Sequence, residues 1–211
     1  MNELVGFFQH VISGFQAMSV WEYSAVVLSI AYMLLAMKQS AWCWVAGGVS
    51  TLIYTLLFFN GALLMESLLN FFYMAMAVYG WWQWRQGQML GARLTLHEEN
   101  QLPISSWSLR AHTWLIVITS IVAVAVGYVM EHYTYADFAY LDSLTTCFGV
   151  VATYLLAKKV LENWLYWVVI DAASIYLYVN KGYFPTVVLF VFYTVLAAVN
   201  YLQWRKSILN N

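Results

Sequence analysis

The sequence predicts an all-α membrane protein that crosses the bilayer seven times. Hydrophobic residues make up 63% of the 211 positions and charged residues only 9%, whereas a soluble domain carries about 25% charge. The chain also contains seven apolar segments of the length that a bilayer core requires, which is about 20 residues per helix. These segments cover residues 20–37, 42–59, 62–84, 111–131, 138–157, 164–180 and 183–204.

The positions of lysine and arginine predict the orientation. If the N-terminus is outside, eight of the nine basic residues fall in inner loops and only Lys181 falls outside. Cytoplasmic loops of membrane proteins carry such an excess of basic residues. We therefore expect an external N-terminus and a cytoplasmic C-terminus.

The segments outside the apolar spans divide the chain further. Residues 1–19 contain apolar residues at helical spacing, and we expect either an amphipathic helix on the membrane surface or a loosely ordered leader. The longest polar stretch runs from Arg85 to Arg110 and predicts a cytoplasmic loop. Together with the fourth span it forms a linking region, residues 86–137, and residues 207–211 form a short tail.

The chain repeats itself at a distance of 120 residues. Without a gap, 13 of the 64 positions from 22 to 85 are identical to those from 142 to 205, including Trp44 with Trp164 and Asn60 with Asn180. Each copy, residues 20–85 and 138–206, contains three spans, and the intervening span gives both copies the same orientation. This 3+1+3 arrangement of parallel repeats is that of the SWEET sugar carriers, so transport is the favoured function by analogy.

Asp171 is the only carboxylate in the middle of an apolar span. A charge there costs about 2.5–3.5 kcal/mol on insertion scales, so we expect it to face a cavity. Trp164, Trp167, Ser174 and Tyr178 share its helix face. A carboxylate between aromatic rings suits a flat cation. The alternative is a protonated aspartate that joins helices by a hydrogen bond.

Equivalent faces of the other spans supply further candidate binding residues. They are aromatic or carry an amide, and the polar groups differ between the repeats, as an asymmetric ligand requires: Trp44, Tyr54, Asn70, Tyr73, Tyr193 and Asn200. Hydrogen bonding between helices is the alternative role for the two asparagines.

Other polar residues have simpler interpretations. Glu22 and Asp142 begin the first and fifth spans, either as favourable charges at helix N-termini or as part of an outer gate. Trp84 and Trp204 are expected to anchor helix ends at the membrane interface. The four histidines lie in or near loops and are expected to form no cluster.

Several functional classes find no support in the sequence. There is no P-loop motif, and the two cysteines have no metal-ligand spacing. A single intramembrane carboxylate provides no catalytic dyad, and the net charge of −1 gives no attraction to nucleic acid. We therefore expect no enzyme activity, no cofactor, no metal and no nucleic-acid partner.

The motifs are those of a known transporter family. Tyr79-Gly80-Trp81, Glu162-Asn163-Trp164 with Trp167, Asp171, and Lys181-Gly182 are spaced as in the PnuC family of bacterial vitamin-precursor transporters, which the chain resembles over residues 20–206. Asn200 stands where a glycine is expected from the family.

The resemblance implies a 3+1+3 bundle in the bacterial inner membrane that carries nicotinamide riboside inward by facilitated diffusion. It also implies that Trp167, Asp171, Asn70 and Tyr73 line the vitamin site. Related members carry thiamine or riboflavin, so the choice of vitamin stays open, as does proton coupling through Asp171. A heptahelical sensor that binds without transport is the alternative from another class, and the sequence leaves a homo-oligomer open.

Overall fold

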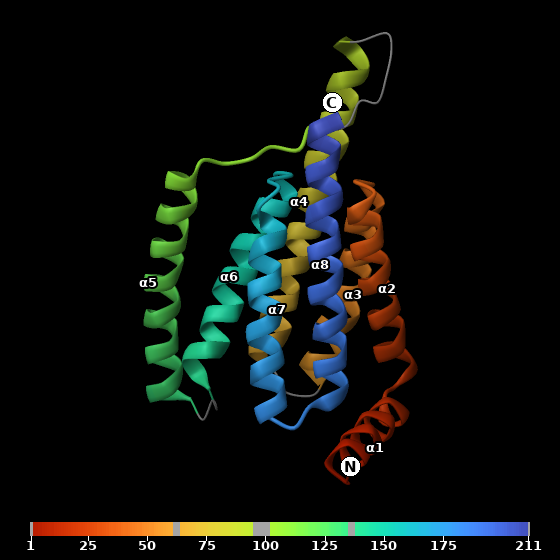
Figure 1. Cartoon of the computed structure of the whole chain (residues 1–211), viewed down its shortest axis with the longest axis vertical. Helices are drawn as coiled ribbons and strands as arrows, with labels where there is room; N and C mark the ends of the chain where they lie inside the picture. Colours follow the sequence, from red (N-terminus) through yellow and green to blue (C-terminus); the bar gives the residue numbers. More distant parts are fainter. Residues whose placement is uncertain (1, 61–63, 95–101, 135–137, 211) are drawn as a thin grey trace. The chain divides into compact units, whose positions relative to one another are not determined.

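The computed structural model describes residues 2–60, 64–94, 102–134 and 138–210, and these contain eight helices and no strand. The helices are α1 (Asn2–Ala17), α2 (Val20–Met37), α3 (Trp42–Asn60), α4 (Leu64–Leu94), α5 (Leu109–Tyr133), α6 (Ala139–Ala157), α7 (Asn163–Asn180) and α8 (Phe184–Asn210). Figure 1 shows them in sequence colours. The described part of the chain is thus all-helical, as predicted.

Five of these helices are long and apolar enough to cross a membrane, among the residues that the structure describes. They are α2, α3, α5, α6 and α8. Helices α4 and α7 cover the other two predicted spans but are not among the five. In α7 the reason is visible in the sequence, because Asp171, two asparagines and several aromatic residues lower its mean hydropathy. The chain is a polytopic, multi-pass membrane protein.

The predicted cytoplasmic loop after Arg85 is wrong in its first part. Helix α4 continues through Leu94, nine residues beyond the predicted end of the repeat. The segment Gln86–Leu94 is polar but contains no proline, so nothing in it stops the helix. The middle of the predicted loop, residues 95–101, which include His97, lies outside the described residues. Helix α8 likewise continues through the predicted tail to Asn210.

The chain divides into two compact units. Unit 1 comprises residues 1–18, 106–152 and 162–201, and unit 2 comprises residues 19–105, 153–161 and 202–211. Within unit 1, the long axes of α5 and α7 run close to the vertical of Figure 1, whereas α6 and α1 are oblique to them. Helix α1 contacts the start of α8, where the rings of His10 and Phe184 stack 5.7 Å apart. Within unit 2, α3 packs against both α2 and α4.

The first and fifth predicted spans end in the same turn, 120 residues apart. After α2, the Gln39 N–H donates to the Ala36 carbonyl at 2.9 Å and Gln39 has φ 54°. After α6, the Lys159 N–H donates to the Leu156 carbonyl at 2.9 Å and Lys159 has φ 52°. Left-handed residues of this kind end many helices. The matching turns support the internal repeat found in the sequence.

Trp84 and Trp204 are not interfacial anchors, contrary to the expectation. They are 1% and 0% exposed and lie in unit 2, with ring centroids 6.1 Å apart. The Trp84 indole N–H donates to the Ala157 carbonyl at 3.1 Å, and that of Trp204 donates to the Ala36 carbonyl at 3.0 Å. Each indole thus donates to a helix-end carbonyl in the other repeat, a position where carbonyls lack their regular helical partner.

Gly80 is required by the packing of Trp44 in unit 2. A Cβ at Gly80 would collide with the indole of Trp44, which is 3% exposed and packs against Trp84 at 5.6 Å between ring centroids. Gly80 therefore permits close helix packing.

We predict that Gly80→Ala destabilises the protein by about 1–3 kcal/mol, the usual cost of overpacking a core. The measurement is the thermal midpoint of the purified protein in detergent. Gly48→Ala is the matched control, because its Cβ would meet only Ala77 Cβ, at 3.3 Å. Equal midpoints for the two variants would show that Trp44 adapts to the added methyl group.

Candidate functional site

Helix α7 presents one buried face, and it is the face predicted to bind a ligand. Trp164, Asp171 and Ser174 are buried, and Trp167 and Tyr178 are half-buried. The opposite side is exposed, as expected for a surface that meets lipid, and carries Leu165, Val169, Tyr176 and Val179. The helix therefore turns its polar and aromatic residues inward.

The carboxyl group of Asp171 has no partner among the residues that the structure describes. The residue is 3% exposed, and no described side chain or backbone group forms a hydrogen bond or an ion pair with it. A buried polar group normally has a partner. The predicted alternative, an aspartate that joins helices by a hydrogen bond, is not what the described residues show. The arrangement instead leaves the carboxyl group available for a ligand.

Aromatic rings connect α7 to α8 within unit 1. Tyr178 stacks on Phe190 with centroids 5.3 Å apart, and Phe190 meets Tyr193 edge-on at 6.1 Å. The predicted candidate Tyr193 is therefore part of an aromatic group that includes the α7 face. Such rings offer π-surfaces to a flat or cationic ligand.

Asn200 is the second polar candidate in unit 1. It is 0% exposed, and its amide nitrogen donates to the Leu196 carbonyl at 2.8 Å, one turn earlier on α8. Its amide oxygen is buried and has no hydrogen-bond partner among the described residues. Hydrogen bonding between helices, the alternative considered from the sequence, therefore does not account for this oxygen.

The position equivalent to Asp171 in the first repeat is Thr51, and it is already satisfied. Its hydroxyl donates to the carbonyls of Gly47 and Gly48 at 3.0 and 3.1 Å, within its own helix. The two repeats therefore differ at this position in chemistry as well as in sequence. The Thr51 hydroxyl is hydrogen-bonded within its own helix, whereas the Asp171 carboxyl group has no partner among the described residues.

The remaining candidates lie in unit 2. Trp44 is buried, and its indole N–H has no hydrogen-bond partner among the described residues. Tyr54 stacks on Phe58 at 5.7 Å, Tyr73 meets Phe72 at 5.9 Å, and Asn70 is half-buried. Their roles in binding stay predictions.

The two gate candidates have structural partners. Glu22 forms a capping box with Ser19 at the start of α2, which accounts for its charge without a gate. Asp142, at the start of α6, lies 3.8 Å from the ammonium of Lys181, which follows α7. That ion pair joins the α6 and α7 ends within unit 1.

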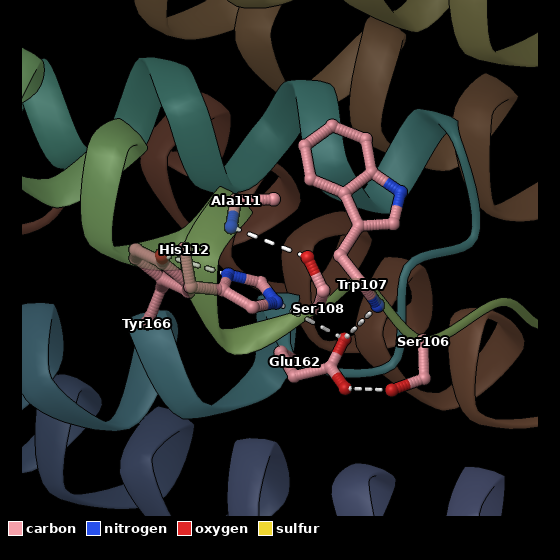
Figure 2. Close-up of polar contacts among 7 residues, drawn as sticks. All are labelled: Ser106, Trp107, Ser108, Ala111, His112, Glu162 and Tyr166. Carbon is pink, nitrogen blue, oxygen red and sulfur yellow. Dashed lines mark hydrogen bonds and ion pairs between the residues drawn. The ribbon is translucent and has the colours of Figure 1, made fainter.

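A polar cluster at the start of α7, which includes His112, was not predicted from the sequence. Figure 2 shows His112 of α5 between two residues of the α7 end, Glu162 and Tyr166. These contacts join positions fifty or more residues apart, so no local sequence pattern revealed them. The Glu162-Asn163-Trp164 motif was the only sequence signal for this cluster. It singles out Glu162 but does not indicate which residue contacts it.

A family model and several curated proteins match the chain. The model described as nicotinamide mononucleotide transporter covers residues 19–206. The nicotinamide riboside transporter PnuC of Escherichia coli is 24% identical over 185 residues, covering 76% of this chain and 74% of that protein. The riboflavin/roseoflavin transporter RibM of Streptomyces davaonensis is 26% identical over 184 residues, covering 84% and 81%.

A solved structure shares the fold. The crystal structure of the vitamin B3 transporter PnuC matches 97% of this chain and 91% of its own, with a TM-score of 0.73 and 19% sequence identity. The family match extends over nearly the whole chain and includes α7 with its buried carboxyl group. The chain belongs to the nicotinamide mononucleotide transporter family of membrane proteins.

Proposed function

We propose that this protein carries nicotinamide riboside across the bacterial inner membrane by facilitated diffusion. The observation that carries the proposal is the Asp171 carboxyl group, which is buried on the helix face that also carries Trp167 and Tyr178 and has no partner among the described residues. The names of the PnuC relatives support the same substrate. The family resemblance expected from the sequence points to the same conclusion.

The chemistry of the ligand fits that carboxyl group. Nicotinamide riboside combines a flat pyridinium cation with an amide and a ribose. A fixed cation supplies the charge partner that an ionised carboxylate lacks in an apolar interior, and aromatic rings attract the same cation through their faces. Asn200 offers a buried amide oxygen that has no donor among the described residues. We propose Asp171, Trp167, Tyr193 and Asn200 as binding residues in unit 1.

We propose Trp44, Tyr54, Asn70 and Tyr73 as binding residues in unit 2. The unpartnered indole N–H of Trp44 supports this for one of them, because a ribose hydroxyl is a suitable acceptor. The binding groups differ between the repeats, as an asymmetric substrate requires.

We propose seven transmembrane helices in a 3+1+3 arrangement, with α4 and α7 added to the five apolar spans. A transport site is lined by polar residues, so a helix that lines one has lower hydropathy than a helix that faces lipid. Helix α7 fits this description. We further propose an external N-terminus and a cytoplasmic C-terminus, on the distribution of Lys and Arg.

A second candidate substrate is another B vitamin of this family. The match to RibM favours riboflavin, and the carboxyl group suits the thiazolium cation of thiamine as well as a pyridinium. The charge of the ligand separates these candidates. Riboflavin is neutral, so its binding should not depend on the charge of Asp171.

Binding and uptake test the proposed function directly. We expect nicotinamide riboside to quench the tryptophan fluorescence of the purified protein saturably, because eleven tryptophans report on a site lined by rings. We also expect saturable uptake into proteoliposomes without an imposed gradient of protons. Protein-free liposomes are the control.

Each outcome has a clear meaning. Binding of thiamine or riboflavin alone would change the substrate and leave the site in place. Binding without uptake would contradict transport and favour a sensor. Uptake that depends on a pH gradient would replace facilitated diffusion by proton coupling.

A further inference from the structure

We propose that Glu162, His112 and Tyr166 form a positioning cluster that fixes the rotation of α7. The proposal rests on the proposed function, since α7 carries Asp171 and Trp167, the residues assigned to the substrate. No contact of the cluster with substrate is needed. The cluster acts through the helix that it holds.

Glu162 stands immediately before α7 but does not cap it. It makes no side-chain hydrogen bond to the N–H groups of its own helix, although a carboxylate at a helix start commonly does so. Its carboxylate instead accepts from the Ser106 hydroxyl and from the Trp107 backbone N–H at 3.3 Å, as Figure 2 shows. Glu162 therefore joins the start of α7 to the segment that leads into α5.

His112 makes the second connection between α5 and α7. Its Nε2 lies 3.5 Å from the Glu162 carboxylate, and its Nδ1 lies 3.0 Å from the Tyr166 hydroxyl. The His112 residue is 8% exposed. Among the described residues Nε2 lies close to the carboxylate but forms no hydrogen bond. The hydrogen bond between Nδ1 and the Tyr166 hydroxyl therefore joins the His112 ring to α7, with the Glu162 carboxylate beside the other ring nitrogen.

The geometry holds α7 at two points on one face. Glu162 and Tyr166 are four residues apart and so lie above one another on the helix. Because successive residues are rotated by about 100°, Trp167 and Asp171 project from a different face. Two contacts on one face oppose rotation about the helix axis, which a single contact would permit. Loss of either contact should therefore misalign the residues that bind the substrate.

Three single variants and one double variant test the proposal. Glu162→Ala removes the carboxylate, and Tyr166→Phe removes a single hydroxyl oxygen. Both should raise the Kd for nicotinamide riboside roughly tenfold, as the loss of a residue that orients ligand-binding groups does elsewhere. His112→Ala should raise it similarly, and His112→Ala with Tyr166→Phe should raise it no further, because both remove the same bond. The KM for uptake should rise with the Kd.

Tyr176→Phe is the matched control. It removes the same atom from the same helix, at a side chain that is 61% exposed. We expect its Kd to stay within twofold of the unmodified protein. A merely structural role for the cluster would lower the thermal midpoint and the amount of active protein, but would leave the Kd of the folded molecules unchanged.

Hydrogen exchange provides a readout that needs no substrate. In Glu162→Ala and Tyr166→Phe, peptides from the first half of α7 should exchange faster, while peptides from α3 should not. An unchanged Kd in both variants, or unchanged exchange in α7, would overturn the proposal. If the unmodified protein binds no nicotinamide riboside, the proposed function fails, and the exchange measurement alone decides whether the cluster holds α7.

Discussion

Replacing Asp171 by asparagine should weaken nicotinamide riboside binding by roughly a hundredfold. Removing one member of a desolvated charge pair costs about 2–5 kcal/mol, and a hundredfold change in Kd is about 2.7 kcal/mol. Asp171 qualifies because it is 3% exposed and has no competing partner among the described residues. The measurement is tryptophan fluorescence quenching, followed by uptake into proteoliposomes.

The same substitution should not lower the stability of the empty protein. An unpartnered buried carboxyl group is unfavourable for folding, and asparagine has nearly the same shape without the charge. We therefore expect the thermal midpoint of Asp171→Asn to equal or exceed that of the unmodified protein while binding is lost. Such opposite effects are typical of a residue retained for function at the expense of stability.

Glu131→Gln is the control for this experiment. Glu131 is an exposed carboxylate at the end of α5, in the same unit as Asp171. The Kd of this variant should be unchanged. A Kd within twofold of the unmodified value for Asp171→Asn would remove Asp171 from the binding site, and a large loss of riboflavin binding in the same variant would show that charge is not the property being recognised.

The sequence was sufficient for the helical class and for most helix ends. Helix α2 begins and ends at the predicted residues, and α7 begins one residue earlier than predicted. These ends were predictable because apolar runs stop at short polar turns such as Lys38-Gln39-Ser40. The extension of α4 to Leu94 was not predictable from hydropathy. A helix can continue past the end of an apolar segment, because its backbone hydrogen bonds do not require apolar side chains.

The candidate face of α7 was predictable, but its surroundings were not. Helical spacing placed Trp164, Trp167 and Asp171 together, and their burial agrees with it. Spacing along one helix does not identify partners from other helices. The lack of a described partner for Asp171 and the contacts of His112 with Glu162 and Tyr166 therefore could not be predicted. The prediction for Trp84 and Trp204 was wrong for a related reason. Tryptophan near a helix end is common both at membrane interfaces and in protein cores. The carbonyl that accepts the indole N–H shows that these two lie in the core, and that carbonyl comes from a distant part of the chain.

Replacing Lys159 by methionine should stabilise the protein at neutral pH, and the gain should shrink above pH 8. Lys159 lies in the turn between α6 and α7 and is 1% exposed. Its ammonium donates to the Gln39 side-chain oxygen at 3.1 Å and lies 4.7 Å from the centroid of the Trp84 ring. No carboxylate among the described residues forms an ion pair with it. The ammonium is therefore buried with only neutral partners.

Burial lowers the pKa of Lys159 from 10.5 to about 8. The unfolded chain therefore binds this proton more tightly than the folded protein does. Below about pH 8 both states are protonated, and the cost of burying the ammonium is present in full. Between pH 8 and pH 10.5 the folded protein loses the proton first, so stability rises with pH. A shift of this size corresponds to about 3 kcal/mol, which the neutral thioether of methionine avoids.

Thermal midpoints measured from pH 6.5 to pH 9.5 check this prediction. Methionine matches the length of the lysine stem and can pack against Trp84, whereas the lost bond to Gln39 costs about 1 kcal/mol. Lys159→Met should thus unfold at a higher temperature than the unmodified protein at pH 7, and the two curves should converge as pH rises. Lys206→Met, at an exposed position, should follow the unmodified protein throughout. A lower midpoint for Lys159→Met at every pH would mean that the Gln39 bond and the Trp84 ring outweigh the cost of burial, and that this contact between matching turns of the two repeats holds unit 2 together.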